Sequence, residues 1–561
     1  MHVQRVFSKG KNGQIYESIL LRTSKRIGKK VASVTLAVLT HLPGWLIEVV
    51  ERAVKLGGNA DSLDQLAVAS GSLEVRSAES FGAIHAVMEV AKATGIPQAL
   101  GGGDTAKLVL WQTLARVLHP SVSLLGMVRM LAATAASRLL GIVQSFTEDD
   151  MYRSGEWIVT NQPRIEKELF DNMPRPSQGL YFYDVTSSYF EGVENELAEF
   201  GYNRDKIKGK KQVVMGLLTD AEGEPLSVQL FPGNTSDLAT FKEQIHKVKE
   251  HFGEQNVTLV GDRGMIRQPQ QQQANAAGLH YISALHKAEI ETLLKSGTLQ
   301  MSLFDTDVQE IVLEDGRRLI TRLNPIRRDE LKAMHDGFKQ RMEAWLAKSN
   351  AYLKEHPKAR VATQIKEGTR RLAKGGLKAW MTLTATGREL VLTGDAEARK
   401  AHTKLDGCYA IVSDLPKIAA TSQQLHDNYK RLNQVEQDFR TLKHGHLEMR
   451  PWYVRSEENT RAHGFTAMLA LKVRRRLEQA WRELNITVEE GLAELGKLCV
   501  MELAEKKTGT VVSRLLPKPN KLQAALLERA GVALPKEAPK PGVAVATRVR
   551  LEDRRKSKVI N

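Results

Sequence analysis

The change of hydrophobic period at Gly179 is the feature that most constrains the fold. In residues 77–172, apolar side chains recur at the three- and four-residue spacing of helices. From Gly179 onward, short runs of β-branched and aromatic residues, the first of them LYFYDVTSSYF, are separated by turn residues. Residues 179–285 therefore predict the order β-β-β-α-β-α-β, which requires an α/β domain with both antiparallel and parallel strands.

This order matches the ribonuclease-H-like fold, a mixed sheet with flanking helices in which the first and fourth strands are neighbours. Asp184 falls on the first predicted strand, and Asp262 follows the fourth. We therefore expect these two carboxylates, far apart in the sequence, to meet. A large α+β insertion, residues 287–404, divides the fold into two parts, and a helical N-terminal region precedes both.

A helix predicted over residues 422–443 brings a third acid. Thr421 and Gln424 have the spacing of a capping box, and Gly445 follows the last turn. One face carries six residues at steps of three and four: Leu425, Tyr429, Leu432, Glu436, Phe439 and Lys443. Glu436 is then expected within an apolar stripe, where an unpaired carboxylate is costly, so a cation should lie close to it.

Asp184, Asp262 and Glu436 are the candidate catalytic residues and metal ligands. An isolated Asp at a strand end is more often a turn or capping residue, but three carboxylates in one place repel one another unless cations lie between them. Oxygen-only ligation favours Mg²⁺ or Mn²⁺. Two such ions roughly 4 Å apart can clamp the attacking and leaving oxygens of a displacement at phosphorus. The predicted reaction is phosphodiester cleavage or transfer.

Three motifs resemble those of the DDE transposases of bacterial insertion sequences: YDVTSSYFEG around Asp184, GDRG around Asp262, and YKRLNQVEQDFRTLK from Tyr429. The resemblance covers most of the chain. It implies that Glu436 is the last metal ligand and that Tyr429 and Lys443 contact DNA phosphates. It also implies cut-and-paste transposition at terminal inverted repeats, in which water and then the freed 3′ hydroxyl attack phosphorus.

Leu432 departs from the broader family pattern, which has Arg three positions after the Tyr. The adjacent Arg431 points about 100° away on an ideal helix, so it does not replace that side chain. Arg440 and Arg263 are further candidates for phosphate binding. Arg263 is equally suited to pairing with a neighbouring acid.

The charge of the chain predicts a polyanionic partner. Its 561 residues include 81 Lys and Arg against 65 Asp and Glu, a net charge of +16, which favours nucleic acid or an acidic membrane surface. Residues 317–374 hold sixteen Lys or Arg and six Asp or Glu. We expect this part of the insertion to lie along double-stranded DNA, with a solvated charged helix as the alternative. The family resemblance implies a homodimer across paired DNA ends.

No membrane segment is predicted, because the most apolar stretch is interrupted by His41 and Pro43. Cys408 and Cys499 are the only cysteines, too few for a disulfide framework or a cysteine-based zinc site. These features predict a cytoplasmic protein.

Several other residues have two interpretations. Trp345 and Trp380 either pack in a core or stack on an unpaired base. Asn234 and Asp237 either line the site or cap a turn. His463 is interpreted as an ordinary helix histidine.

The expected domain order begins with a β-hairpin and helix that bind DNA ends or serve in docking. The full series is this N-terminal unit (1–75), a helical domain (76–175), the first part of the core (176–286), the insertion (287–404), the second part of the core (405–480), a helical appendix (481–535) and a disordered basic tail (536–561). Two other functions stay open: a catalytically inactive DNA-binding protein derived from a transposase, and a ribonuclease-H-like nuclease without strand transfer.

Overall fold

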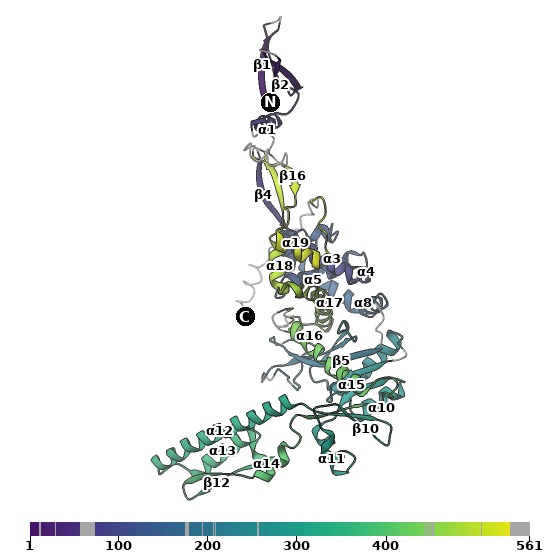
Figure 1. Ribbon diagram of the computed structural model, residues 1–561, viewed down its shortest axis with the longest axis vertical. Helices are drawn as coiled ribbons and strands as arrows, with labels where there is room; N and C mark the ends of the chain where they lie inside the picture. The colour runs from purple at the N-terminus through teal and green to yellow at the C-terminus, as the bar shows by residue number, and fades with distance from the viewer. Residues whose placement is uncertain are drawn as a thin grey trace, which may run out of the picture. The chain divides into compact units, whose positions relative to one another are not determined.

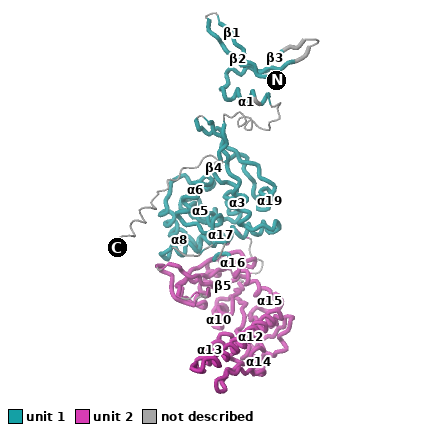
Figure 2. The backbone as a smooth tube through the Cα atoms, turned by 90° about the vertical axis from the view of Figure 1, so that its left-hand side faces the viewer, with its two compact units in different colours: residues 1–169, 441–449, 454–561 teal, residues 170–440, 450–453 magenta. Residues whose placement is uncertain are grey.

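The computed structural model describes residues 1–10, 13–27, 30–55, 73–173, 179–192, 194–202, 204–205, 207, 209–254, 257–443, 446–447, 449, 454–506 and 508–538. The chain divides into two compact units, shown in Figure 2. Unit 1 comprises residues 1–169, 441–449 and 454–561, and unit 2 comprises residues 170–440 and 450–453. Most of the expected basic tail lies outside the described residues.

Unit 2 is built on an eight-stranded mixed sheet with the order β10-β11-β14-β9-β8-β5-β6-β7. Its strands are β5 (Leu180–Tyr189), β6 (Gln212–Thr219), β7 (Pro225–Pro232), β8 (Thr258–Gly261), β9 (His280–Ala284), β10 (Gln309–Val312), β11 (Arg318–Leu323) and β14 (Cys408–Ser413). Strand β5 pairs antiparallel with β6 and parallel with β8, and β8 pairs parallel with β9.

The predicted order β-β-β-α-β-α-β is confirmed over β5 to β9. The two helices in it are α9 (Asp237–His246), which continues into a π-helical turn (Lys247–His251), and α10 (Gln268–Ala276). Tyr181, Tyr183 and Phe241 are fully buried in the core beside the sheet. Helix α11 (Lys287–Lys295) and a 3₁₀ turn (Met301–Leu303) follow β9.

The predicted insertion is shorter than expected, because the hairpin β10–β11 belongs to the central sheet. Strand β11 pairs antiparallel with β14, which in turn pairs with β9. The sequence signal showed a hairpin but not the strand it would pair with. What remains outside the sheet is α12 (Pro325–Glu355), α13 (Val361–Lys374), a 3₁₀ turn (Leu377–Ala379), β12 (Met381–Thr386), β13 (Glu389–Gly394) and α14 (Ala396–Thr403).

These elements gather in one lobe of unit 2 with a hydrophobic core of its own (Figure 1). Trp380 is buried in that core, and Trp345 packs against it. The packing interpretation of both tryptophans is therefore confirmed.

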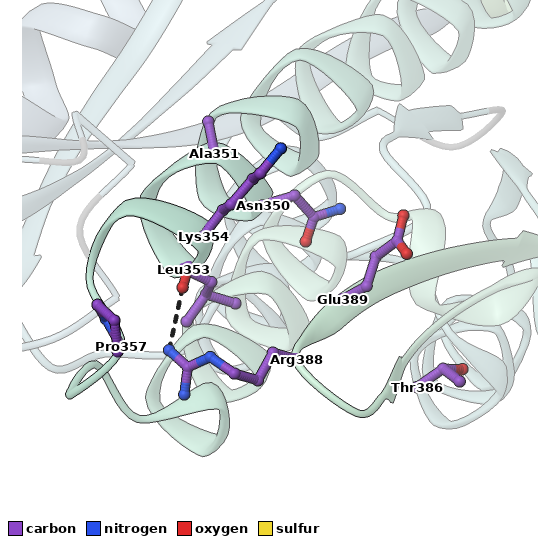
Figure 3. Close-up of a pocket in the computed structure, with 8 residues that line it drawn as sticks. All are labelled: Asn350, Ala351, Leu353, Lys354, Pro357, Thr386, Arg388 and Glu389. Carbon is purple, nitrogen blue, oxygen red and sulfur yellow. Dashed lines mark hydrogen bonds between the residues drawn. The ribbon is translucent and has the colours of Figure 1, made fainter.

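Arg388 ties the end of α12 to the turn between β12 and β13 (Figure 3). One guanidinium nitrogen donates to the carbonyl oxygens of Leu353, His356 and Ala359 at 3.0, 2.9 and 3.2 Å. The Asn350 side chain also exchanges two hydrogen bonds with the Leu390 backbone, at 2.9 and 2.8 Å. A cation at these carbonyl groups satisfies acceptors that the helix leaves open and opposes its dipole.

Unit 1 begins with a three-stranded antiparallel sheet, β1 (His2–Lys9), β2 (Ile15–Ile27) and β3 (Lys30–Val38), followed by α1 (Gly44–Lys55). The predicted hairpin corresponds to β2 and β3. Strand β1 was missed because it buries little surface: only Val3 and Val6 are even partly buried along it, so its sequence has no continuous apolar face.

The remainder of unit 1 joins residues from both ends of the sequence. Strand β4 (Leu73–Ser80) pairs with β15 (Cys499–Glu505), which pairs with β16 (Val511–Leu515). The helices are α3 (Gly82–Ala93), α4 (Ile96–Leu100), α5 (Asp104–Leu118), α6 (Leu124–Ala133), α7 (Ala136–Leu139), α8 (Glu148–Asp171), α17 (Glu457–Trp481) with a 3₁₀ turn (Arg482–Leu484), α18 (Val488–Gly496) and α19 (Lys521–Arg529). The expected helical appendix (481–535) therefore contains two strands, β15 and β16, as well as helices α18 and α19.

Helix α17 differs in position from the prediction, which placed it in the second part of the core. It is buried along most of its length and contacts α3, α5, α18 and α19 within unit 1. His463 on this helix lies against the Arg116 guanidinium, at 3.1 and 3.2 Å, and bonds the Met449 carbonyl. Burial and Arg116 lower the pKa of His463, as expected of a packed neutral histidine.

Within the part of the chain that the structure describes, no helix has the length and apolarity needed to span a bilayer.

We predict that Arg388→Met loosens the end of α12, because three carbonyl groups lose their shared donor. The expected cost is about 1–2 kcal/mol in local opening free energy. Amide hydrogen exchange should become faster in the last turn of α12 and in β13, and remain unchanged in β5. Arg360→Met, at an exposed arginine before α13, is the control; equal exchange in both variants would contradict the prediction.

Candidate active site

The parallel pairing of β5 with β8 brings the first two predicted acids together. Tyr183 and Gly261 are Cα partners in the register, and the next residues are Asp184 on β5 and Asp262 directly after the end of β8. The Asp184 carboxylate is partly buried and accepts a hydrogen bond from the Val185 amide at 2.7 Å. Asp262 is exposed at the end of β8.

Asp184 lies in a strongly acidic environment. The pKa of its carboxyl is raised to about 7, with burial as the largest cause; the charges of Asp262 and Glu436 act in the same direction, and the Val185 amide and the Arg204 guanidinium oppose them. The charge of Glu436 therefore acts on Asp184. Such a group either keeps a proton near neutral pH or requires an added cation.

Tyr429 connects the helix to this pair of acids. Its hydroxyl donates to Asp262 Oδ1 at 3.3 Å. Burial and then the Asp262 carboxylate raise the pKa of Tyr429, so the phenol stays protonated, while Arg263 acts in the opposite direction. Arg263 itself is exposed beside Asp262.

The predicted helix over residues 422–443 is in fact two helices, α15 (Ser422–Arg431) and α16 (Asn433–Lys443), with Leu432 between them. The capping box of Thr421 and Gln424 is confirmed. At the junction the Leu432 amide bonds the Tyr429 carbonyl at 3.2 Å, and the Val435 amide bonds the Leu432 carbonyl at 3.1 Å. These three-residue steps tighten one turn into 3₁₀ geometry, which strict helical spacing could not reveal.

This tighter turn changes which residues are buried. Val435, Phe439 and Leu442 form the apolar face of α16, and Glu436 is exposed at its edge. The expected burial of Glu436 within the stripe was therefore wrong, and its carboxylate is free of that desolvation cost.

Two of the proposed phosphate-binding residues lie farther along α16. Arg440 is exposed one turn after Glu436. Lys443 is buried in the last turn, which belongs to unit 1, whereas the turns before it belong to unit 2. Gly445, the predicted end of the helix, lies outside the described residues.

Arg204 is a neighbour of Asp184 that the sequence did not predict. Its backbone amide bonds Ser187 Oγ on β5 at 3.0 Å, and its guanidinium forms an ion pair with Asp237 at the start of α9. Asp237 and Asp262 both lie next to Gly264, since a Cβ atom at that position would be 4.0 Å from Asp237 Oδ2 and 3.7 Å from Asp262 Oδ2. Asp237 therefore lies beside the site. Arg204 was not predicted because it lies in an irregular loop, which has no periodic sequence pattern.

A buried ion pair fixes the start of α15. Arg318 on β11 makes a two-pronged contact with Glu310 on β10, at 3.0 and 3.2 Å, and is 3% exposed. The same guanidinium donates to the Leu415 and Ala420 carbonyls, which precede the helix, at 3.1 and 2.7 Å. Ser422, the first residue of α15, also donates to Glu310.

The donor set suits a hard divalent cation. Among the described residues, no three His, Cys, Asp or Glu side chains form a group that could hold a metal ion as they stand. Asp184, Asp262 and Glu436 nevertheless offer only oxygen, which Mg²⁺ and Mn²⁺ prefer. A bound cation would oppose the burial and the neighbouring negative charges that raise the pKa of Asp184.

Comparison with known proteins identifies the family of the chain. The family model of the transposase DDE domain matches residues 175–472. The chain belongs to this DDE transposase family. A piggyBac transposase, solved by cryo-EM as a synaptic complex with hairpin DNA, resembles this DDE transposase chain with 8% identity and a TM-score of 0.37, over 70% of each chain. No curated protein matches it.

We predict that Asp184→Asn stabilises the metal-free protein at pH 8 but not at pH 4. The folded-state pKa of about 7 lies above the unfolded value of about 3.9. Between these values the folded state binds more protons, so wild-type stability falls as the pH rises through this window. The expected gain at pH 8 is on the order of 1–3 kcal/mol.

Thermal unfolding in a chelator from pH 4 to pH 8 measures this effect. Glu291→Gln, at an exposed acid on α11, is the control and should follow the wild type. The prediction fails if Asp184→Asn and wild type lose stability equally as the pH rises.

Leu432→Arg, which restores the broader family pattern, should destabilise this chain. Leu432 is 8% exposed at the junction of α15 and α16, so the new guanidinium would be buried there. We expect a loss of about 1–3 kcal/mol in urea unfolding. Arg431→Gln, at the exposed neighbour, should change stability by less than about 0.5 kcal/mol. An unaltered midpoint for Leu432→Arg would show that the junction accommodates a cation.

Proposed function

We propose that this chain is a transposase that cleaves and joins DNA at the terminal inverted repeats of a bacterial insertion sequence. The observation that carries the proposal is the meeting of Asp184 and Asp262 on neighbouring parallel strands, with Glu436 close enough to raise the pKa of Asp184. Membership of the DDE transposase family supports the same activity.

The core of unit 2 is proposed to be ribonuclease-H-like. The support is the strand order β7-β6-β5-β8-β9, in which the first three strands are antiparallel and the last three parallel. In such a sheet the end of β8 lies beside the middle of β5, where Asp184 stands next to Asp262.

Asp184, Asp262 and Glu436 are proposed to hold two Mg²⁺ or Mn²⁺ ions, which supply Lewis-acid stabilisation of the attacking and leaving oxygens. Tyr429 keeps Asp262 oriented through its hydroxyl hydrogen bond. Arg204, fixed by Asp237, supplies a permanent positive charge next to Asp184.

The remaining cationic side chains are assigned to the DNA backbone. Arg263 is exposed beside Asp262, and Arg440 is exposed on the same helix as Glu436. Tyr429 and Lys443 are proposed to contact phosphates at the DNA end, as the family pattern implies.

The proposed cycle has two displacements at phosphorus. Water first attacks the phosphorus at the element end. The bond between phosphorus and the 3′ oxygen breaks, which leaves a 3′ hydroxyl and a 5′ phosphate. That 3′ hydroxyl then attacks a target phosphodiester and releases a target 3′ hydroxyl. Each step conserves charge and needs no oxidant, reductant or covalent protein intermediate. A homodimer is proposed to hold the two ends.

Asp184→Ala should reduce cleavage of end-containing DNA by more than about 10²-fold, because several kcal/mol of transition-state stabilisation are lost. Asp262→Ala and Glu436→Ala should have the same effect. Glu291→Ala, at an exposed acid on α11, is the matched control. The assay uses purified protein, end-containing duplex and Mg²⁺ or Mn²⁺, with a labelled 3′ end.

The outcomes separate the three candidate functions. A labelled 3′ end joined to target DNA supports transposition, and cleavage without joining indicates a nuclease. Salt-dependent DNA binding without cleavage under any divalent metal indicates an inactive DNA-binding protein. Cleavage that survives Asp184→Ala overturns the assignment of the site.

A further inference from the structure

A second group of polar side chains, which the catalytic proposal does not use, converges beside α15. Arg322 on β11 and Tyr409 on β14 are Cα partners across neighbouring strands. His426 and Lys430 lie one turn apart on α15. All four residues belong to unit 2.

His426 is the centre of this group and is 4% exposed. Its Nε2 lies 2.7 Å from the Tyr409 hydroxyl and 3.1 Å from an Arg322 guanidinium nitrogen, and its Nδ1 lies 2.8 Å from Asp427 Oδ1. Because Arg322 can only donate, Nε2 is the acceptor and the ring proton sits on Nδ1, directed at Asp427. Burial lowers the pKa of His426, in agreement with a neutral ring.

Two cationic side chains therefore contact the Tyr409–His426 pair, Arg322 through His426 and Lys430 through the Tyr409 ring. Lys430 Nζ lies 4.4 Å from the centre of the Tyr409 ring. Burial and the charge of Arg322 lower the pKa of Lys430. Across the described residues, no carboxylate forms an ion pair with Arg322 or Lys430, and the nearest acid, Asp427, is bonded to His426 and Gln423.

Two like charges that act on each other raise the energy of the folded chain unless an anion binds near both. The position of Lys430 favours a DNA phosphate as this anion, because Lys430 directly follows Tyr429, whose hydroxyl bonds Asp262. Neighbouring residues point about 100° apart on a helix. Lys430 thus faces the flank of α15 rather than the carboxylates.

We infer that Arg322 and Lys430 form a binding subsite for a DNA backbone phosphate outside the catalytic centre, with His426 and Tyr409 holding the two cations in place. The inference rests on the proposed function, because it assigns the phosphate to DNA whose end is at Asp184 and Asp262. Arg322 supplies planar donors fixed by its bonds to His426 and to the Thr306 carbonyl at 2.8 Å, and exposed Lys430 supplies a second, adjustable donor.

The test is the salt dependence of binding to end-containing duplex, measured in EDTA with the full-length chain. Each lost phosphate contact should make the slope of log affinity against log salt shallower by about 0.9. Lys430→Gln should show this change and weaken binding roughly 3- to 10-fold near 0.15 M salt. Lys430→Arg should restore both values.

Two controls separate a subsite from general charge and from folding. Lys295→Gln removes one exposed cation from α11 and should leave the slope unchanged. Lys430→Gln leaves the bonds among Tyr409, His426 and Arg322 in place, so its melting temperature should equal that of wild type. Arg322→Gln should give the smaller slope even if its melting temperature falls, because it also removes one cation.

A Lys430→Gln slope equal to that of wild type overturns the inference, and so does an equal change in Lys295→Gln. Cleavage by wild type in Mg²⁺ is scored in parallel. Cleavage with an unchanged Lys430→Gln slope rejects the subsite alone, whereas absence of both cleavage and DNA binding in wild type rejects the proposed function.

Discussion

The pairing of β5 with β8 is the constraint on which the rest of unit 2 depends. A parallel register fixes Asp184 and Asp262 at one edge, and the backbone hydrogen bonds of the sheet hold them there against their mutual repulsion. Burial and the neighbouring acids together raise the pKa of Asp184. Arg204, held by its ion pair with Asp237, opposes part of this shift, and divalent cations are proposed to compensate the rest.

Helix α15 is placed against this edge by two separate polar networks. The Arg318–Glu310 ion pair holds its first turn through Ser422 and the preceding carbonyl groups. The His426 network holds its middle. A shift of α15 would separate the Glu310 carboxylate from Ser422 and the Arg318 guanidinium from the preceding carbonyl groups. Because buried charges that lose their partners are costly, the helix has few alternative positions. Tyr429 lies one turn beyond the second anchor and reaches Asp262.

The sequence predicted the strand order and the two Asp positions because each strand is a short apolar run bounded by turn residues. It could not predict which elements pair over long distances: β10–β11 joined the central sheet, and α17 packed in unit 1. The sequence also could not show the 3₁₀ turn at Leu432. This turn rotates the second helix by a fraction of a turn, but the spacing of the apolar residues along the sequence is the same with or without it. Arg204 gave no signal because loops have no periodicity.

The lobe inserted between β11 and β14 leaves and rejoins the sheet at one place. Leu323 and Cys408 are Cα partners, and the Asn324 amide bonds the Gly407 carbonyl at 2.8 Å. In topological terms, residues 324–407 are therefore the loop of a β-hairpin, although they contain a hydrophobic core of their own. A lobe attached in this way can be enlarged, exchanged or shortened to a tight turn without altering the register of the strands on either side. This site of attachment lets the catalytic sheet and the surface around it diversify independently.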